Sequence, residues 1–215
     1  LSGAFRLGAI PTIAPFILPQ ALSALKAGYP DLKLYLREDL SARLVEGLRA
    51  RTLDAALIAL PYDAPGLEAV TLVADEFVLV APQGHALLTR NGLSPEDLKG
   101  ESLLLLEDGH CLRDHAIASC QLSDQVGQGR SDISATSLHT LVQMVAGGLG
   151  ISLVPRLATR PGAPGHLTDG MAVGVRAFTQ PIVGRSIGIV WRKGSARAAE
   201  ARLIGQTIKT LLSAL

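Results

Sequence analysis

The sequence predicts an α/β fold in which helices cover a mostly parallel sheet, and three observations lead to this prediction. Alternating or apolar runs are separated by stretches whose apolar residues recur at helical spacing. The run AALIAL at 55–60 is wholly apolar, as expected for a strand buried on both faces of a parallel sheet. The length of 215 residues suffices for one sizeable core or two small domains.

The first sixty residues alternate between strand and helix patterns. We expect a strand at 5–10, a loop and helix at 11–30, a strand at 32–39, a helix at 41–53 and a strand at 54–60. The first helix should close near Gly28 and Pro30, and Ser41 is expected to cap the second helix at its N-terminus. This β-α-β-α-β order indicates helices packed on a mostly parallel sheet.

The rest of the chain continues the alternation. We expect one or two strands at 71–82, and then a short helix that starts at Ser94 and Pro95 and is followed by a strand before 108. A Ser-capped helix and a strand should follow within 134–155. The chain should end with a strand at 186–195 and a helix at 196–215. The polar residues Ser134, Thr136 and Ser137 are best explained as the start of the Ser-capped helix. The glycines of VAGGLGI then end it, because this segment lacks the Gly-Lys-Ser/Thr ending of a phosphate loop.

The charge balance argues against direct nucleic-acid binding by these residues. There are 20 basic and 19 acidic residues, for a formal net charge of +1, and no basic run stands out. No apolar run approaches the roughly 18–20 residues that a membrane span needs, and no signal peptide is visible. We therefore expect a cytoplasmic protein. The chain starts without Met, almost directly in a strand, so a further segment is expected upstream.

Both cysteines lie in the stretch LEDGHCLRDHAIASC, as Cys111 and Cys120, nine positions apart. In a reducing compartment such a pair is more often catalytic, metal-binding or redox-sensing than structural, although free cysteines are also commonly buried as small apolar residues. With His110 and His115 the pair offers four zinc ligands, but the spacing departs from that of structural zinc sites. We expect no metal and no cofactor. Neither His-Glu-x-x-His nor Cys-x-x-Cys occurs, and we expect no enzyme.

Several segments together resemble a known family. LGAIPTIAPFILPQAL, YPDLKLYLRED, LVEGLRARTLDAALIAL and LVQMVAGGLGISLVP resemble the effector-binding half of LysR-type transcriptional regulators, over nearly the whole chain. LEDGHCLRDHAIASC is similar to the redox segment of the hydrogen-peroxide-sensing members of that family, with both cysteines at their spacing. Most other members lack the run Gly-His-Cys-Leu-Arg-Asp.

The resemblance implies a fold of two Rossmann-like subdomains, similar to a type II periplasmic binding protein. Regulatory subdomain I would comprise residues 1–75 plus 184–215, and regulatory subdomain II, with the redox segment, residues 76–183. A winged helix-turn-helix would precede Leu1 and bind DNA. The family further implies homodimers and homotetramers, an activator of oxidative-stress genes, contact with RNA polymerase, and a glutaredoxin- or thioredoxin-type reductant.

The resemblance also implies roles for individual residues. Cys111 would be oxidised by hydrogen peroxide to a sulfenic acid, and Cys120 would then close a disulfide with it. The peroxide pocket would be formed by Thr12, Ser41, His110 and Arg185. Ser41 stands where better-known members have Thr, which keeps the hydroxyl but loses the methyl that restrains its rotamer. Arg185 would be a cationic partner for the thiolate.

Local helix geometry explains why such a disulfide would act as a switch. With Asp108 or Gly109 as N-cap, Cys111 falls in the first turn of a helix, where the dipole favours an anion. Nine helical residues at 1.5 Å rise separate the two Cα atoms by roughly 13–14 Å. A disulfide tolerates about 7 Å, so the helix would have to unwind.

Two other functions remain open at this point. One is a domain of the same fold that binds a small effector or solute, with incidental cysteines, in which Cys111→Ser would be harmless. The other is a thiol peroxidase that consumes peroxide catalytically with thioredoxin, although the chain fits no peroxidase motif.

Overall fold

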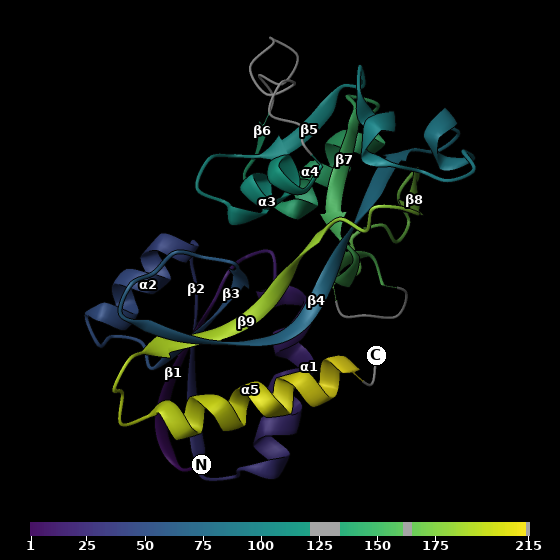
Figure 1. The fold of residues 1–215 in the computed structure, drawn as a ribbon. Helices are drawn as coiled ribbons and strands as arrows, with labels where there is room; N and C mark the ends of the chain where they lie inside the picture. Colours follow the sequence, from purple (N-terminus) through teal and green to yellow (C-terminus); the bar gives the residue numbers. More distant parts are fainter. Residues whose placement is uncertain (121–133, 161–164, 214–215) are drawn as a thin grey trace. The chain divides into compact units, whose positions relative to one another are not determined.

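The chain folds as two compact units, described here from a computed structural model of residues 1–120, 134–160 and 165–213. The first unit combines Leu1–Ala74 with Ser186–Leu215, and the second is Asp75–Arg185. The chain passes between them inside two strands, β4 (Leu67–Pro82) and β9 (Gly184–Arg192), which are drawn in blue and yellow-green in Figure 1.

The first unit is built on the predicted alternation of strands and helices. β1 (Gly3–Ala9) pairs in parallel with β2 (Leu32–Glu38) on one side and with β3 (Ala55–Leu60) on the other. β9 follows β3 in the sheet and runs antiparallel to it. The β-α-β-α-β start predicted from the sequence is confirmed, and the antiparallel partner makes the sheet mixed.

Helices cover both faces of this sheet. They are α1 (Ala14–Gly28), α2 (Ser41–Arg49) and α5 (Ala198–Ser213). A Cβ added to Gly8 would lie 2.7 Å from Leu44 of α2, so glycine is what lets that helix approach β1. On the other face α5 approaches β9, where a Cβ on Gly205 would lie 2.8 Å from Ile189. α1 packs beside α5 (Figure 1).

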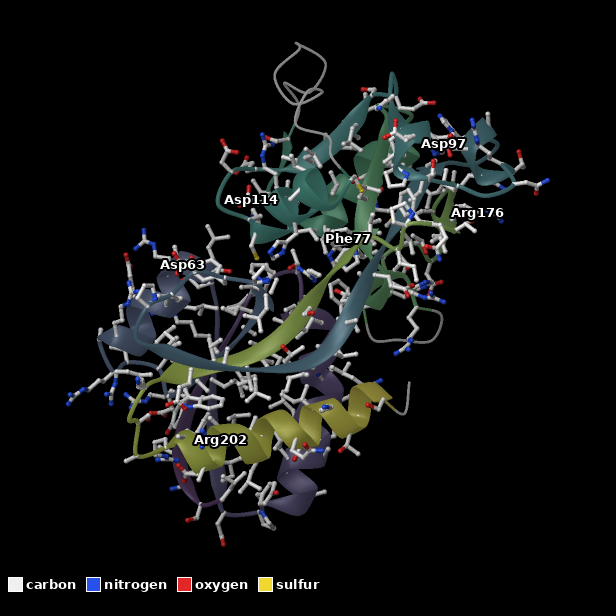
Figure 2. All side chains as sticks on the ribbon, in the orientation of Figure 1. Asp63, Phe77, Asp97, Asp114, Arg176 and Arg202 are labelled. Atoms are coloured by element: carbon white, nitrogen blue, oxygen red, sulfur yellow. The ribbon has the colours of Figure 1, made fainter. Side chains whose placement is uncertain are left out.

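The chain's single tryptophan fixes α5 to the sheet of the first unit. Trp191 of β9 is 1% exposed, and its indole Nε1 donates a hydrogen bond of 3.0 Å to Glu68. The guanidinium of Arg202, labelled on α5 in Figure 2, lies 4.8 Å from the centroid of the tryptophan ring. Arg202 also donates to the same Glu68 carboxylate at 3.1 Å. This cation–π stack and shared carboxylate join three segments that are distant in sequence.

The second unit is a mixed sheet with the thiol helix at one end of a parallel strand. Besides β4 and the start of β9, the described residues of this unit form the strands β5 (Leu103–Leu106), β6 (Ser134–Ala135), β7 (Ile151–Pro155) and β8 (Val173–Ala177). β7 and β8 run antiparallel to β4, whereas β5 runs parallel to both β7 and β6. All residues of β5 and β7 are buried.

The helical segments among the described residues of the second unit are two α-helices and three 3-10 turns. They are α3 (Cys111–Ser119), α4 (Leu138–Ala146), η1 (Ala86–Leu88), η2 (Pro95–Leu98) and η3 (Arg156–Thr159). The predicted caps are confirmed at two of them. Ser94 and Asp97 form a capping box at η2, and the Ser137 hydroxyl accepts from the Thr140 N–H at the start of α4.

The structure corrects several local predictions. Ser41 does not cap α2: Leu40 is the N-cap, and Ser41 is the first helical residue. The N-cap of α3 is His110, one or two residues later than predicted, although Cys111 is in the first turn as expected. β4 is one continuous strand and starts four residues earlier than the predicted 71. The sheet is less parallel than predicted because β9 runs antiparallel to β3, and β4 runs antiparallel to β7 and β8.

Among the described residues, no helix is both long and apolar enough to cross a bilayer.

Candidate functional site

The two thiols stand at opposite ends of α3. Cys111 is its first residue and Cys120 its C-cap, and both are buried, with 8% and 3% of their surface exposed. Neither forms a disulfide. The helical spacing keeps their Cα atoms roughly 13–14 Å apart, beyond the about 7 Å that a disulfide spans. The structure is therefore a reduced state in which the thiols cannot join while α3 is intact.

A glycine turn delivers Cys111 to the helix start. The chain leaves β5 at Leu106, and the His110 N–H donates to the Glu107 carbonyl at 3.4 Å. Gly109 has φ 93°, in the left-handed region that side chains rarely adopt, so this turn favours glycine at position 109. Cys111 then stands where the first N–H groups of the helix have no intrahelical acceptor and the dipole favours an anion.

The positive charge of Arg113, close to Cys111 in sequence, is directed to the end of β5. Its Nε lies 2.9 Å from the Asp108 carboxylate, and its guanidinium also donates to the Leu106 carbonyl at 3.2 Å. Asp114 is exposed on α3 and is labelled in Figure 2. Asp108 therefore offsets the support that Arg113 would give to a thiolate, and Arg113 mainly fastens the helix start to the sheet.

His110, the residue before the thiol, is half-buried and links two elements. Burial lowers its pKa from the usual 6.5, against the Glu107 carboxylate and a hydrogen bond with the backbone of Thr136, which both raise it. The imidazole is therefore neutral at pH 7 and ties the start of α3 to the loop between β6 and α4.

Arg185, the predicted cationic residue, forms a buried ion pair that sequence reasoning missed. Its Nε lies 3.0 Å from Asp75, and the two side chains are 0% and 2% exposed. Asp75 also accepts from the Leu157 N–H at 3.2 Å. Burial raises the pKa of Asp75, while Arg185 and the Leu157 N–H act to lower it. The available signal was the acidic pair Asp75-Glu76 inside the otherwise apolar strand TLVADEFVLV.

Thr12 and Ser41 belong to the first unit, whereas His110, Cys111, Cys120 and Arg185 belong to the second. Thr12 is 3% exposed in the turn after β1, and Ser41 is 2% exposed at the start of α2. The Asp39 N–H donates to the Ala9 carbonyl at 3.3 Å, which joins the chain after β2 to the end of β1. The two hydroxyls therefore lie at the same edge of their sheet, where parallel strands end.

Two other chemistries gain no support from the geometry. Within the described residues, no three His, Cys, Asp or Glu side chains gather closely enough to hold a metal ion. The second chemistry is that of a serine hydrolase, whose nucleophile lies in a Gly-x-Ser-x-Gly pattern at a strand-turn-helix. The sequence has this pattern at 184–188, but the segment lies inside β9. Ser186 instead pairs with Leu60 of β3.

Comparison with known families decides what kind of domain this is. The family model described as "LysR substrate binding domain" matches residues 1–213. The chain belongs to this LysR family. The predicted fold class, an α/β domain of the type II periplasmic-binding-protein kind, is thereby confirmed.

Its LysR relatives include regulators named for hydrogen peroxide. The chain is 41% identical over 201 residues to the "Probable hydrogen peroxide-inducible genes activator" of Streptomyces viridosporus, covering 93% of this chain and 62% of that protein. It is 35% identical over 224 residues to the "DNA-binding transcriptional dual regulator OxyR" of Escherichia coli (strain K12), covering 100% of this chain and 71% of that protein. The chain thus spans about two thirds of the length of these relatives.

Solved structures of LysR regulators give the same picture. The reduced OxyR2 regulatory domain of Vibrio vulnificus matches with a TM-score of 0.87 at 37% identity, over 98% of this chain and 96% of that one. A hydrogen-peroxide-bound cysteine mutant of Corynebacterium glutamicum OxyR matches with a TM-score of 0.90 at 33% identity, over 99% of this chain and 66% of that one.

Proposed function

We propose that the chain is the redox-sensing regulatory domain of a LysR-type transcription factor, in which hydrogen peroxide oxidises Cys111. The observation that carries the proposal is the placement of two buried thiols, not joined in a disulfide, at the two ends of one helix. The names of the relatives and of the structures, which refer to hydrogen peroxide and to OxyR, support the same function.

The proposed chemistry has two balanced steps. The Cys111 thiolate attacks one oxygen of hydrogen peroxide, the O–O bond breaks, and the departing hydroxide takes a proton to become water. The product is a sulfenic acid at Cys111. The Cys120 thiol then attacks that sulfur and releases a second water, which leaves a disulfide. Because intact α3 holds the thiols too far apart, the second step requires the helix to unwind.

The pocket residues have separate roles in this proposal. Thr12 and Ser41 supply hydroxyl groups that hydrogen-bond peroxide, and His110, neutral at pH 7, presents its ring beside the thiol. Arg185 is the cationic partner of the thiolate. Oxidation occurs once per molecule and a separate reductant resets it, so the domain acts as a sensor and not as an enzyme.

The whole protein would act on DNA through a domain outside these 215 residues. The two compact units serve as regulatory subdomains I and II, and unwinding of α3 changes the contacts between copies in a homodimer or homotetramer. The consequence is activation of oxidative-stress genes in the cytoplasm, through RNA polymerase, with a glutaredoxin- or thioredoxin-type protein as reductant.

Intact-mass measurement and peptide mapping after one equivalent of hydrogen peroxide test this function. The reduced chain should lose about 2 Da and yield a peptide that joins Cys111 to Cys120. Cys120→Ser should instead gain about 16 Da at Cys111, as a trapped sulfenic acid, and Cys111→Ser should stay unchanged. If both thiols of the unaltered chain remain free in excess peroxide, the sensing function is wrong. The domain would then be an effector-binding one with incidental cysteines.

A further inference from the structure

The buried ion pair of the second unit joins three of its elements. Asp75 comes from β4 and Arg185 from β9, and Asp75 also accepts a hydrogen bond from the N–H of Leu157 in η3. The backbones are close as well, since a Cβ on Gly184 would lie 2.7 Å from the Asp75 carbonyl oxygen. The guanidinium is therefore held in one place by a carboxylate whose other oxygen is itself hydrogen-bonded.

A contribution to the stability of the fold does not by itself explain why Asp75 and Arg185 are buried as an ion pair. Two charges with 0% and 2% of their side chains exposed have lost most of their hydration, and apolar residues of similar volume often stabilise such a position as well or better. A buried pair that joins otherwise apolar strands is therefore a candidate for a role in chemistry.

Strand register places the pair at the edge of the sheet where α3 begins. Leu104 of β5 pairs with Ser152 of β7, and Pro155 of β7 pairs with Phe77 of β4. Because β5 and β7 are parallel, both end at the level of the first residues of the second unit. The chain leaves β5 at this edge and reaches Cys111 within five residues. The distance from β4 across β7 to β5 is two strand spacings, or roughly 10 Å.

Other charges near this edge are more exposed. Glu107, Asp108 and Asp114 flank Cys111 and are exposed, and Asp108 is bridged by Arg113. Arg156 of η3 pairs with Glu76 of β4 at 2.7 Å, with side chains 62% and 38% exposed. Solvent screens these groups, whereas a charge inside the unit acts over roughly 10 Å with little screening.

We infer that Asp75 is a positioning residue for Cys111 that acts through Arg185. Its carboxylate fixes the guanidinium at the edge where α3 starts, and its negative charge limits how strongly Arg185 stabilises the thiolate. The inference rests on the proposed function, in which Arg185 is the cation that faces the thiol. It adds a residue that sets how readily the sensor thiol ionises.

The test is the pH dependence of alkylation of Cys111 by iodoacetamide, measured with Cys120→Ser so that one thiol reacts. Asp75→Asn removes the balancing charge and should lower the midpoint by about 0.5–1 pH unit. Arg185→Gln removes the cation and should raise the midpoint by a similar amount. A purely structural role would move both variants in the same direction, so opposite shifts are the signature.

Glu76→Gln is the matched control, since it removes the same charge one residue away on an exposed side chain, and it should move the midpoint by less than about 0.2 unit. Shifts of one sign, or none, for Asp75→Asn and Arg185→Gln would overturn the inference. If the Asp75→Asn variant does not fold, the double variant Asp75→Asn/Arg185→Gln, in which both side chains are neutral, is measured in its place. This double variant should have a lower midpoint than Arg185→Gln alone, and equal midpoints would overturn the inference. Alkylation needs no peroxide, so failure of the proposed function shows separately in the mass experiment.

Discussion

α3 and α4 are two helices of nine residues in the same unit, and they are held in very different ways. α4 has a side-chain cap at Ser137 and buries Leu138, Leu141, Val142 and Val145. α3 has no side-chain cap hydrogen bond, and among its residues only Leu112 is a fully buried large aliphatic. Each such side chain contributes roughly 1.5–3 kcal/mol. The helix that must unwind for a disulfide is therefore the one that costs less to unwind.

The largest expected effect comes from breaking the better-held helix. Leu141→Ala should lower the free energy of unfolding of the second unit by about 2–5 kcal/mol, because a side chain 1% exposed leaves a cavity. Urea denaturation followed by circular dichroism measures it. Gln143→Ala, exposed on the same helix, is the control and should change stability by under about 0.5 kcal/mol. Equal losses in the two variants would mean that α4 is not held by its apolar face.

A smaller effect should appear without any substitution. Amide hydrogens of α3 should exchange at least about tenfold faster than those of α4 in the reduced chain, because local opening of α3 exposes less apolar surface. Hydrogen exchange read by NMR at Cys120 and Gly147, each of which donates to a carbonyl of its own helix, gives a direct comparison. Equal protection would contradict the view that α3 is the weaker helix.

The smallest expected effect is a pH dependence at the start of α3. The folded pKa of His110 is lowered by burial, so the unfolded chain binds protons more readily below about pH 6.5. The free energy of unfolding should then fall as pH decreases from 7.5 through 6.5 towards 5, by under about 1 kcal/mol after solvent screening.

His110→Asn should remove that part of the pH dependence, and thermal melts at several pH values measure the difference. His139→Asn, on the exposed side of α4, serves as the comparison and should keep the slope of the unaltered chain. A slope unchanged in His110→Asn would show that protonation at this position does not loosen α3.

The parts of the fold that were predictable are those whose pattern is local. The alternation of β2 and the apolar run of β3 can each be recognised within six or seven residues. The helical spacing of apolar residues in α5 can be recognised along that helix. β6 has two residues and β8 lies in a glycine-containing stretch, so neither carries a pattern long enough to read. Cap positions shifted by one or two residues because several polar residues in a row satisfy the same rule.

The candidate site was predictable only in part, for a physical reason. The thiols and His110 lie in one short segment and stand out by residue type. The pairing of Asp75 with Arg185 joins positions 110 residues apart and arises only when β4, β9 and η3 meet. The shared pocket of Thr12, Ser41, His110 and Arg185 stays a prediction, as does the division at 75 and 184 into functional subdomains.

The stack of Trp191 on Arg202 has an optical consequence. This tryptophan is the only one in the chain, and the three tyrosines, at 29, 35 and 62, also belong to the first unit. Emission from these rings therefore follows the melting of the first unit. The second unit, with both thiols, contributes no tryptophan or tyrosine light of its own. Any change in that emission when Cys111 is oxidised would therefore report a structural change transmitted from the second unit to the first.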